Sequence, residues 1–412
     1  MTFDSYKLED LCEKITDGSH QSPKSVDEGY PMASVKDLTP FGIDLDSCRL
    51  ISSEDYTKLV QQGCRPEVND ILIAKDGNSC LETVMVQREE QEVVLLSSVA
   101  ILRPNPSKVD PKYLSLYLSD KRVIKDMKER LVSGSAIPRV ILKAFREYEV
   151  NLPPIQIQKK ISSILGAIDE KLELNILMNQ KLEEMAMILY KHWFIDFGPF
   201  QEGEFLETEL GLIPKDWKIH SIYDLADYIN GKAFKTKDLN EQGKLPVIKI
   251  AELKSGLSSN TKYYSESYQV KHEINNGDVL FAWSASLGVY LWSKDKALLN
   301  QHIFKVQPKE GNIGKPFIYF MLKSLIKKFV QIAASRATTM GHITKEHIVN
   351  EKVALPPHEI FEEIQDDLNE YYKLILSNLK ETEQLTKIRD NLLPKLLSGE
   401  IDLVQVKEVL DL

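Results

Sequence analysis

Apolar positions recur with alternating spacings of four and three residues in two long stretches of the chain. The first stretch follows Leu152-Pro153-Pro154, and the second follows Leu355-Pro356-Pro357, 203 positions later. This heptad spacing is typical of a coiled coil. The seam of the first stretch consists of Ile161, Leu165, Ile168, Leu172, Asn175, Asn179, Leu182, Ala186, Leu189 and Trp193. The second seam, in the same phase, consists of Ile364, Leu368, Tyr371, Ile375, Asn378, Thr382, Leu385 and Leu392.

Each stretch predicts a helix of roughly 35 to 40 residues, about 55 Å long at 1.5 Å per residue. A single apolar stripe is more often the buried face of an ordinary amphipathic helix. A helix of this length, however, needs a partner of equal length. The other long helix is the obvious candidate. Asn175 and Asn378 occupy the same place in the two seams, where a buried polar residue costs stability and fixes the register. Pairing these asparagines favours an antiparallel arrangement, because the residues between the helices can return the chain.

The segments that precede the two helical stretches follow the same order of elements. The first contains strand patterns at 31–38, 70–74 and 99–103 and a helical pattern at about 111–131. The second contains strand patterns at 246–253, 277–282 and 302–306 and a helical pattern at about 315–333. The loops differ between the copies, which suggests one scaffold that carries two separate specificities.

The chain is therefore expected to be an α+β protein with an internal pseudo-twofold repeat. Two mixed α/β domains are each followed by a long helix, and the two helices pair as an antiparallel coiled coil. The expected boundaries are 1–153 for the first domain, 154–197 for the first helical region, 198–209 for a linker, 210–356 for the second domain, and 357–412 for the second helical region with the C-terminal tail.

The net charge of −9 is unevenly distributed along the chain. Residues 198–356 carry 21 basic and 17 acidic side chains, whereas residues 357–412 carry 6 basic and 13 acidic ones. The acidic C-terminal helix does not suit a position along DNA, but it could face a basic partner protein. The overall sign of the charge therefore does not exclude nucleic-acid binding.

Membrane, export and zinc-binding signals are weak. No apolar run approaches twenty residues, and the first ten residues lack the basic start and apolar core of an export signal, so a cytoplasmic location is expected. The four cysteines, which lack a Cys-x-x-Cys pair and a nearby histidine cluster, are interpreted as reduced thiols in preference to a zinc site: Cys12, Cys48, Cys64 and Cys80.

Two short motifs superficially suggest chemistry. Gly311-Asn312-Ile313-Gly314-Lys315 is similar to a phosphate loop, but Pro316 stands where a magnesium-binding Ser or Thr is needed, and the spacing is short. Asn151-Leu152-Pro153-Pro154 is similar to an adenine-methyltransferase motif, but that motif needs proline directly after asparagine and an aromatic residue at its end. No catalytic or metal-binding residue is predicted.

Several stretches together resemble the specificity (S) subunit of type I restriction-modification systems. They are Leu152-Pro153-Pro154-Ile155-Gln156-Ile157-Gln158-Lys159-Lys160-Ile161, then Trp193-Phe194-Ile195-Asp196-Phe197, Gly211-Leu212-Ile213-Pro214-Lys215-Asp216-Trp217, and Leu392-Leu393-Pro394-Lys395-Leu396-Leu397-Ser398-Gly399-Glu400-Ile401. The likeness covers essentially the whole chain, and the last stretch is its most specific part.

The resemblance implies a non-catalytic role in binding double-stranded DNA. Each target-recognition domain would read one half of a bipartite site, and the paired helices would space the domains. The helices would also hold two methyltransferase (M) subunits and, through them, the restriction and translocase (R) subunits. S-adenosylmethionine, ATP and Mg²⁺ would then belong to the partner subunits rather than to this chain.

Candidate DNA contacts can be named only at the level of loops. Base edges are read by Arg, Lys, Asn, Gln and small hydroxyl side chains, while basic side chains and backbone groups hold the phosphates. In the first domain the candidates are Gly18, Ser19, His20, Lys36, Lys75, Asn78, Ser135 and Arg139. In the second they are Lys232, Phe234, Lys249, Trp283, Ser284, Ser286, Arg336, Thr338, Thr339 and His342. The alternative for each is a solvated turn residue or, for Trp283, a core aromatic.

Two other functions fit the same pattern. A free-standing transcriptional or architectural DNA binder could also use duplicated domains on a rigid spacer, and it would bind a specific sequence tightly as an isolated chain. A pure scaffold, whose globular domains bind protein, would leave a reconstituted complex unable to protect any DNA sequence.

Overall fold

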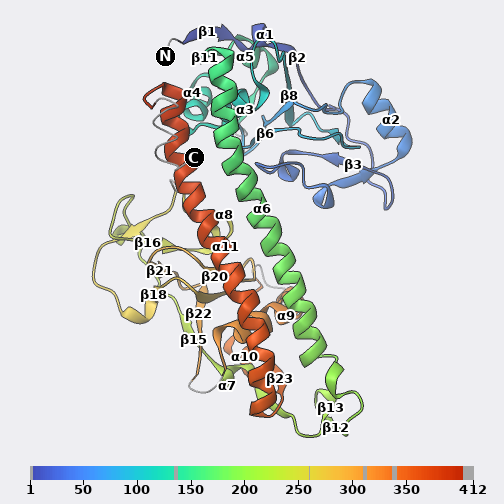
Figure 1. Cartoon of the computed structure of the whole chain (residues 1–412), viewed down its shortest axis with the longest axis vertical. Helices are drawn as coiled ribbons and strands as arrows, with labels where there is room; N and C mark the ends of the chain where they lie inside the picture. The colour runs from blue at the N-terminus through green and yellow to red at the C-terminus, as the bar shows by residue number, and fades with distance from the viewer. Residues whose placement is uncertain (1–2, 134–137, 259, 310–312, 336–340, 402–412) are drawn as a thin grey trace. The chain divides into compact units, whose positions relative to one another are not determined.

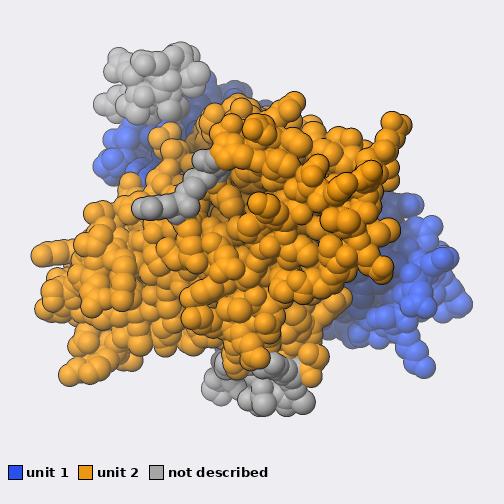
Figure 2. All heavy atoms as spheres, turned by 90° about the horizontal axis from the view of Figure 1, so that it is seen from below, with its two compact units in different colours: residues 1–173, 385–412 blue, residues 174–384 orange. Residues whose placement is uncertain are grey.

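The computed structural model describes residues 3–133, 138–258, 260–309, 313–335 and 341–401. The chain divides into two compact units (Figure 2): unit 1 contains residues 1–173 and 385–412, and unit 2 contains residues 174–384. Each long helix therefore contributes to both units. Each unit consists of one globular domain together with part of each helix.

The two predicted long helices are present. Helix α6 (Ile155–Phe194) begins directly after Pro153-Pro154, and helix α11 (His358–Ser398) begins directly after Pro356-Pro357 (Figure 1). Proline has a fixed φ and lacks an N–H donor, so it is favoured at the start of a helix and disfavoured in its interior. The helices contain 40 and 41 residues, which confirms the length that the heptad pattern predicts.

Helices α6 and α11 contact each other in both units, and their contacts in unit 2 are antiparallel. In unit 1, Arg389 Nη1 lies 3.3 Å from Asp169 Oδ1. In unit 2, Asn378 Nδ2 donates to Asn179 Oδ1 at 2.9 Å, and the Phe194 and Phe361 rings lie 6.2 Å apart. Within unit 2, higher residue numbers on α6 face lower numbers on α11, which confirms the antiparallel prediction.

The predicted pairing of Asn175 with Asn378 is wrong by one helical turn. Asn378 bonds to Asn179, whereas the buried Asn175 donates through Nδ2 to Glu381 Oε2 at 2.9 Å. Positions that match in sequence do not have to face each other in an antiparallel pair, since the register depends on where the two helices cross. The polar layer still lies in the middle of the seam, as expected.

The buried face also departs from the predicted heptad positions toward the helix ends of unit 2. Tyr372 is buried where Tyr371 was expected, while Tyr190 and Phe194 are buried in place of Leu189 and Trp193. A straight α-helix has 3.6 residues per turn, so its buried face drifts by about 20° per heptad from a strict 3.5-residue repeat. The globular domain also packs against this flank and covers the shifted positions.

The first domain contains two sheets with a helical layer. One sheet has the order β2-β8-β5-β6, formed by β2 (Cys12–Asp17), β8 (Val99–Pro104), β5 (Ile71–Ala74) and β6 (Val84–Val86). The other has the order β4-β3-β7, formed by β4 (Arg49–Ile51), β3 (Tyr30–Ala33) and β7 (Val94–Leu95). The remaining elements are β1 (Asp4–Lys7) paired with β11 (Glu149–Leu152), β9 (Val132–Ser133) paired with β10 (Arg139–Val140), and α1 (Leu8–Leu11), α2 (Ser53–Gln61), α3 (Pro111–Ser119), α4 (Lys121–Leu131) and α5 (Leu142–Glu147).

The second domain repeats this strand order, with one additional strand, β18, in its second sheet. Its first sheet has the order β15-β22-β19-β20, formed by β15 (Ala226–Asn230), β22 (Ile303–Pro308), β19 (Asp278–Ala282) and β20 (Gly288–Trp292). Its second has the order β17-β16-β21-β18, formed by β17 (Tyr263–Tyr264), β16 (Leu245–Ile248), β21 (Ala297–Leu299) and β18 (Glu273–Ile274). The other elements are β14 (Lys218–Ser221) paired with β23 (Lys352–Leu355), the hairpin β12 (Phe205–Thr208) and β13 (Gly211–Pro214), and α7 (Ile222–Leu225), α8 (Ile250–Ser255), α9 (Lys315–Ala334) and α10 (Lys345–Asn350).

Three predicted elements end earlier than expected. Strands β3 and β16 stop at Ala33 and Ile248, and a short helix follows each of them. The helix expected at 111–131 is two helices, because the Asp120 carboxylate accepts hydrogen bonds from the backbone N–H groups of Arg122 and Val123 and so caps a new helix. The corresponding helix of the second domain, α9, continues without a break.

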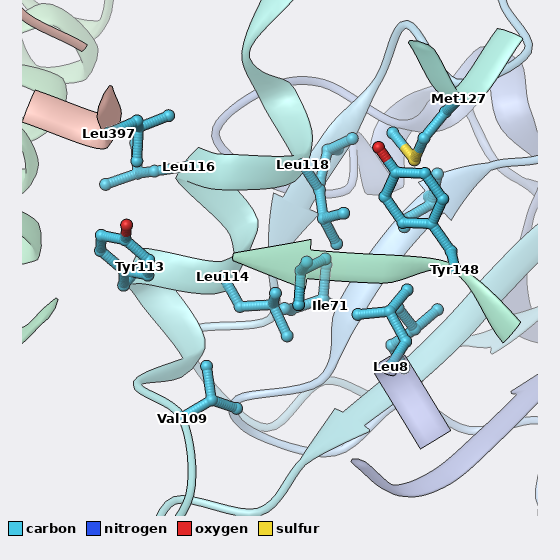
Figure 3. Close-up of a cluster of buried hydrophobic side chains, with 14 of the residues drawn as sticks. Leu8, Ile71, Val109, Tyr113, Leu114, Leu116, Leu118, Met127, Tyr148 and Leu397 are labelled. Atoms are coloured by element: carbon cyan, nitrogen blue, oxygen red, sulfur yellow. The ribbon is translucent and has the colours of Figure 1, made fainter. Parts of the chain in front are cut away.

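The long helices belong to the domain cores as well as to each other. In unit 1, Leu397 of α11 lies beside Leu116 of α3 (Figure 3), in a buried cluster that also includes Ile71 of the sheet and Leu165 of α6. In unit 2, the rings of Phe194 and Phe317 lie 5.1 Å apart. The domains are thus packed directly on the helix pair.

The described residues contain no helix that is both long enough and apolar enough to cross a membrane. Within the same residues, no cluster of three or more His, Cys, Asp or Glu side chains is placed to hold a metal ion. The four cysteines are free thiols, and burial raises the pKa of Cys12 and of Cys48 to about 12.

Candidate nucleic-acid interface

Gly18 and Gly231 follow strands β2 and β15 and occupy equivalent places in the two domains. The N–H of Gly18 donates to Val99 O, and a Cβ atom added to Gly18 would lie 2.2 Å from Leu95 O. Gly231 is similar: its N–H donates to Ile303 O, and an added Cβ atom would lie 2.1 Å from a backbone oxygen. Both positions need glycine because another strand passes close by. Gly18 therefore shapes the loop rather than presenting a side chain to DNA.

Replacing Gly18 with alanine is expected to destabilise unit 1 by about 1 to 3 kcal/mol, the usual cost of overpacking. Gly42→Ala is the matched control, since an added Cβ atom at Gly42 would meet nothing within 4 Å. Urea unfolding of the two variants measures the difference. Equal stability of both would contradict the close approach.

In the first domain, Asp17 and Asp76 connect three candidate residues. His20 Nε2 lies 3.3 Å from Asp17 Oδ1, and Lys75 Nζ lies 3.3 Å from Asp17 Oδ2 and 3.7 Å from Asp76 Oδ1. Arg139 Nε donates to Asp76 Oδ1 at 3.0 Å, and this hydrogen bond raises the pKa of Arg139. Lys75 is only 3% exposed, so it organises the two aspartates and does not suit direct contact with DNA.

The sequence prediction did not include Asp17 and Asp76 among the candidate DNA contacts. Acidic side chains repel phosphate, so a search for DNA contacts does not select them. Their positions in the sequence could have indicated them. Asp17 ends β2 and Asp76 follows β5 by two residues, so both lie at loops that the prediction had already selected.

The other candidates of the first domain have different environments. Ser19 is buried, and its Oγ donates to Gln21 O at 2.9 Å, so it holds the loop. Lys36 and Asn78 are exposed and available for contact. Backbone bonds join Leu96 N to Ala33 O and Ser19 N to Leu95 O, which brings the ends of β2, β3 and β7 together. Ser135 lies outside the described residues.

In the second domain, Trp283 is the centre of a mixed aromatic and polar group. Its ring lies 5.6 Å from the rings of Phe304 and His302 and 6.4 Å from that of His342, and its Nε1 donates to Asn230 Oδ1 at 3.4 Å. Ser284 is buried and forms a backbone bridge with His342. The structure brings together the predicted residues Trp283, Ser284 and His342. The prediction missed Asn230 and His302. Their positions could have indicated them, because Asn230 is the polar last residue of β15 and His302 is the polar residue directly before β22.

Lys232 and Phe234 form a second group in this domain. Lys232 Nζ donates to Tyr264 OH at 2.8 Å and lies 4.4 Å from the centre of the Tyr264 ring and 5.3 Å from that of Phe234, within cation–π range. Lys249 is exposed before α8, and Ser286 is partly buried. The candidates outside the described residues are Arg336, Thr338 and Thr339.

Backbone hydrogen bonds define which loop positions are equivalent in the two domains. Val140 N donates to Lys75 O at 2.9 Å, and Ile343 N donates to Trp283 O at 2.9 Å. Lys75 therefore corresponds to Trp283. In the adjoining antiparallel bridges, Asp76 opposite Arg139 corresponds to Ser284 opposite His342. One backbone framework thus presents different side chains in the two copies.

Comparisons with known proteins agree with this duplication. The family model described as "Type I restriction modification DNA specificity domain" matches residues 1–184 and 214–387. The type I restriction enzyme MjaIX specificity subunit of Methanocaldococcus jannaschii is 27% identical over 301 residues, which cover 69% of this chain and 68% of that protein. The HindI specificity subunit of Haemophilus influenzae is 24% identical over 383 residues, with 77% and 83% covered.

The chain also has the fold of a solved structure, the S subunit of a type I restriction-modification system from M. genitalium. The TM-score is 0.53 at 18% sequence identity, and the match covers 96% of each chain.

Proposed function

We propose, since this chain belongs to the family of type I restriction-modification DNA specificity subunits, that each of its globular domains reads one half of a bipartite DNA sequence. The observation that carries this division is the replacement of Lys75, Asp76 and Arg139 by Trp283, Ser284 and His342 at equivalent loop positions. Because base edges are distinguished by the donors and acceptors that they meet, different side chains on one framework select different sequences.

Protection of DNA by the complex with the methyltransferase partner tests this function. A complex that protects two short specified segments, separated by unspecified base pairs, supports it. Equally tight and specific binding by the isolated chain would favour a free-standing DNA binder instead. A complex that protects no sequence would favour a protein scaffold.

The helix pair is proposed to space the domains and to hold two M subunits, through which the R subunits are attached. Part of α6 in unit 2 supports a docking role, since it exposes apolar side chains beside the seam: Leu174, Leu177, Met178, Met185 and Ile188. Contiguous exposed apolar surface is typical of protein interaction sites. Ile188, with 70% exposure, is the most accessible of the five.

Ile188→Glu is expected to weaken binding of the M subunit by about tenfold or more, roughly 1.4 kcal/mol, because it places a charge in an apolar contact. Gln180→Glu adds the same charge at an exposed position on another face of α6 and should leave assembly unchanged. Analytical ultracentrifugation of the mixed subunits measures both. Equal weakening by the two variants would point to charge repulsion, and no weakening by either would place the M subunit elsewhere.

Deletion from Arg389 onward is a poor test of the same surface. It would remove Leu392, Leu393, Leu396 and Leu397, which are buried in the core of unit 1. The C-terminal part of α11 belongs to the core of unit 1, so its removal would disturb folding as well as assembly. Point substitutions of exposed residues separate assembly from folding.

The catalytic steps are proposed to belong to the partner subunits, with S-adenosylmethionine, ATP and Mg²⁺ bound there. This chain would contribute recognition, spacing and assembly. A cytoplasmic location is part of the same proposal, because the DNA target lies there.

A further inference from the structure

We propose that Arg139, held in place by Asp76, reads a guanine in the half-site of the first domain. The inference rests on the proposed function, which it refines from a domain that reads DNA to one side chain that reads one base. The two side chains lie in unit 1, where Asp76 follows strand β5 and Arg139 begins strand β10.

The Arg139 guanidinium is oriented by two hydrogen bonds. Its Nε donates to Asp76 Oδ1 at 3.0 Å, and its Nη2 donates to Asp76 Oδ2 at 3.3 Å. Arginine has five N–H donors, so the bonds along this edge leave both Nη1 hydrogens and one Nη2 hydrogen for another partner. Guanine presents two acceptors, N7 and O6, in the major groove, and arginine commonly binds both of them.

The backbone on both sides of Arg139 is fixed as well. Gly77 N donates to Pro138 O at 3.0 Å, and Val140 N donates to Lys75 O at 2.9 Å. Gly77 adopts a φ of +85°, a conformation that glycine tolerates and most other residues avoid. The side chain of Arg139 is nevertheless 53% exposed. An exposed group whose position is already fixed loses less freedom on binding, which favours specific contact.

A base is a better partner for this guanidinium than a phosphate. The carboxylate of Asp76 offsets the positive charge of Arg139, and phosphate binding depends mainly on net positive charge. The buried Lys75 cannot replace that charge at the surface, since Asp17 and Asp76 both lie within 4 Å of its Nζ. The geometry of the remaining N–H donors is unaffected by this neutralisation, so hydrogen bonding to a neutral base is retained.

The second domain provides an internal comparison. His342 and Ser284 occupy the places of Arg139 and Asp76, and an imidazole ring has no forked set of donors. The position that Arg139 reads in one half-site should therefore lack an equivalent guanine contact in the other half-site. This difference separates the inference from a general role of the loop in binding DNA.

Competition binding with the assembled complex tests the proposal. Duplexes that carry the recognised sequence are changed at one base pair at a time within the half-site of the first domain. For the wild-type complex, replacing one guanine is expected to weaken binding by about ten- to hundredfold, the discrimination of a good bidentate contact. With Arg139→Ala, the same replacement should cost less than about threefold, while discrimination at the other positions persists.

Arg139→Lys keeps the positive charge but removes the fork of donors, so it should also lose discrimination at that one base pair. Asp76→Asn should reduce the discrimination there without lowering affinity for unrelated DNA, because Asp76 positions the guanidinium and does not itself attract DNA. His342→Ala should leave the guanine preference intact and affect the other half-site only.

The proposal is overturned if Arg139→Ala weakens binding to all sequences equally, since that result indicates a phosphate contact. It is also overturned if Arg139→Lys retains full discrimination, since the fork of donors would then not be what reads the base. Unchanged discrimination in every Arg139 variant would overturn it too. The proposed function would survive these outcomes as long as the complex still protects a bipartite sequence. Loss of that protection in the wild-type complex is a separate result, which would remove the function itself.

Discussion

Exchange of residues 1–153 for the corresponding residues of a relative with a different target is expected to change one half of the recognised DNA sequence. The other half should stay the same, because the second domain has its own sheets and loops. Binding to the original site should fall by about a thousandfold or more, the low end of the usual ratio between specific and non-specific affinity.

The junction at Pro153 is favoured by the structure of the domain. Strand β1 pairs with β11 between Asp4 and Leu152, so the exchanged piece includes both strands that close the domain. A hybrid joined inside β11 serves as the control, because it would pair strand segments from two different proteins and should fold less well. Sequencing of bases methylated by the hybrid complex measures the outcome. A change in both halves would contradict independent reading by the two domains.

Replacing Leu165 with alanine is expected to reduce the free energy of unfolding by about 2 to 5 kcal/mol. Leu165 has no exposed surface, and it shares one buried cluster with residues of the sheet, of α3 and of α11. The lost side chain therefore weakens the contacts of α6 with the domain as well as with the other helix.

Leu177→Ala is the control for this effect, since Leu177 lies on the same helix but is 52% exposed. Its expected change in stability is within about 0.5 kcal/mol, as for most surface substitutions. Chemical unfolding measured by circular dichroism compares the two variants. Similar losses in both would mean that the buried seam does not stabilise the helix pair.

The sequence predicts the long helices well because their signals are local. The Pro-Pro pairs mark where α6 and α11 begin, and the spacing of apolar residues marks the buried face. The duplicated order of strands is also visible in sequence. The exact register is not, because Asn179 meets Asn378 through the crossing of two helices that are distant in the chain.

The candidate site is predicted as a set of loops but not as an arrangement of side chains. Lys75 looks like a DNA contact in sequence, yet its burial between two aspartates depends on loops that fold together from separate segments. The equivalence of Arg139 and His342 likewise depends on backbone bonds to residues about 60 positions away. Such pairings are set by tertiary structure, which local patterns do not encode.

Mapping methylated bases across the genome of cells that carry this gene with its methyltransferase partner tests the central claim most directly. The account predicts one methylated sequence made of two specified segments separated by several unspecified base pairs, lost when this gene is deleted. A single uninterrupted sequence, or methylation that does not depend on this chain, would contradict it.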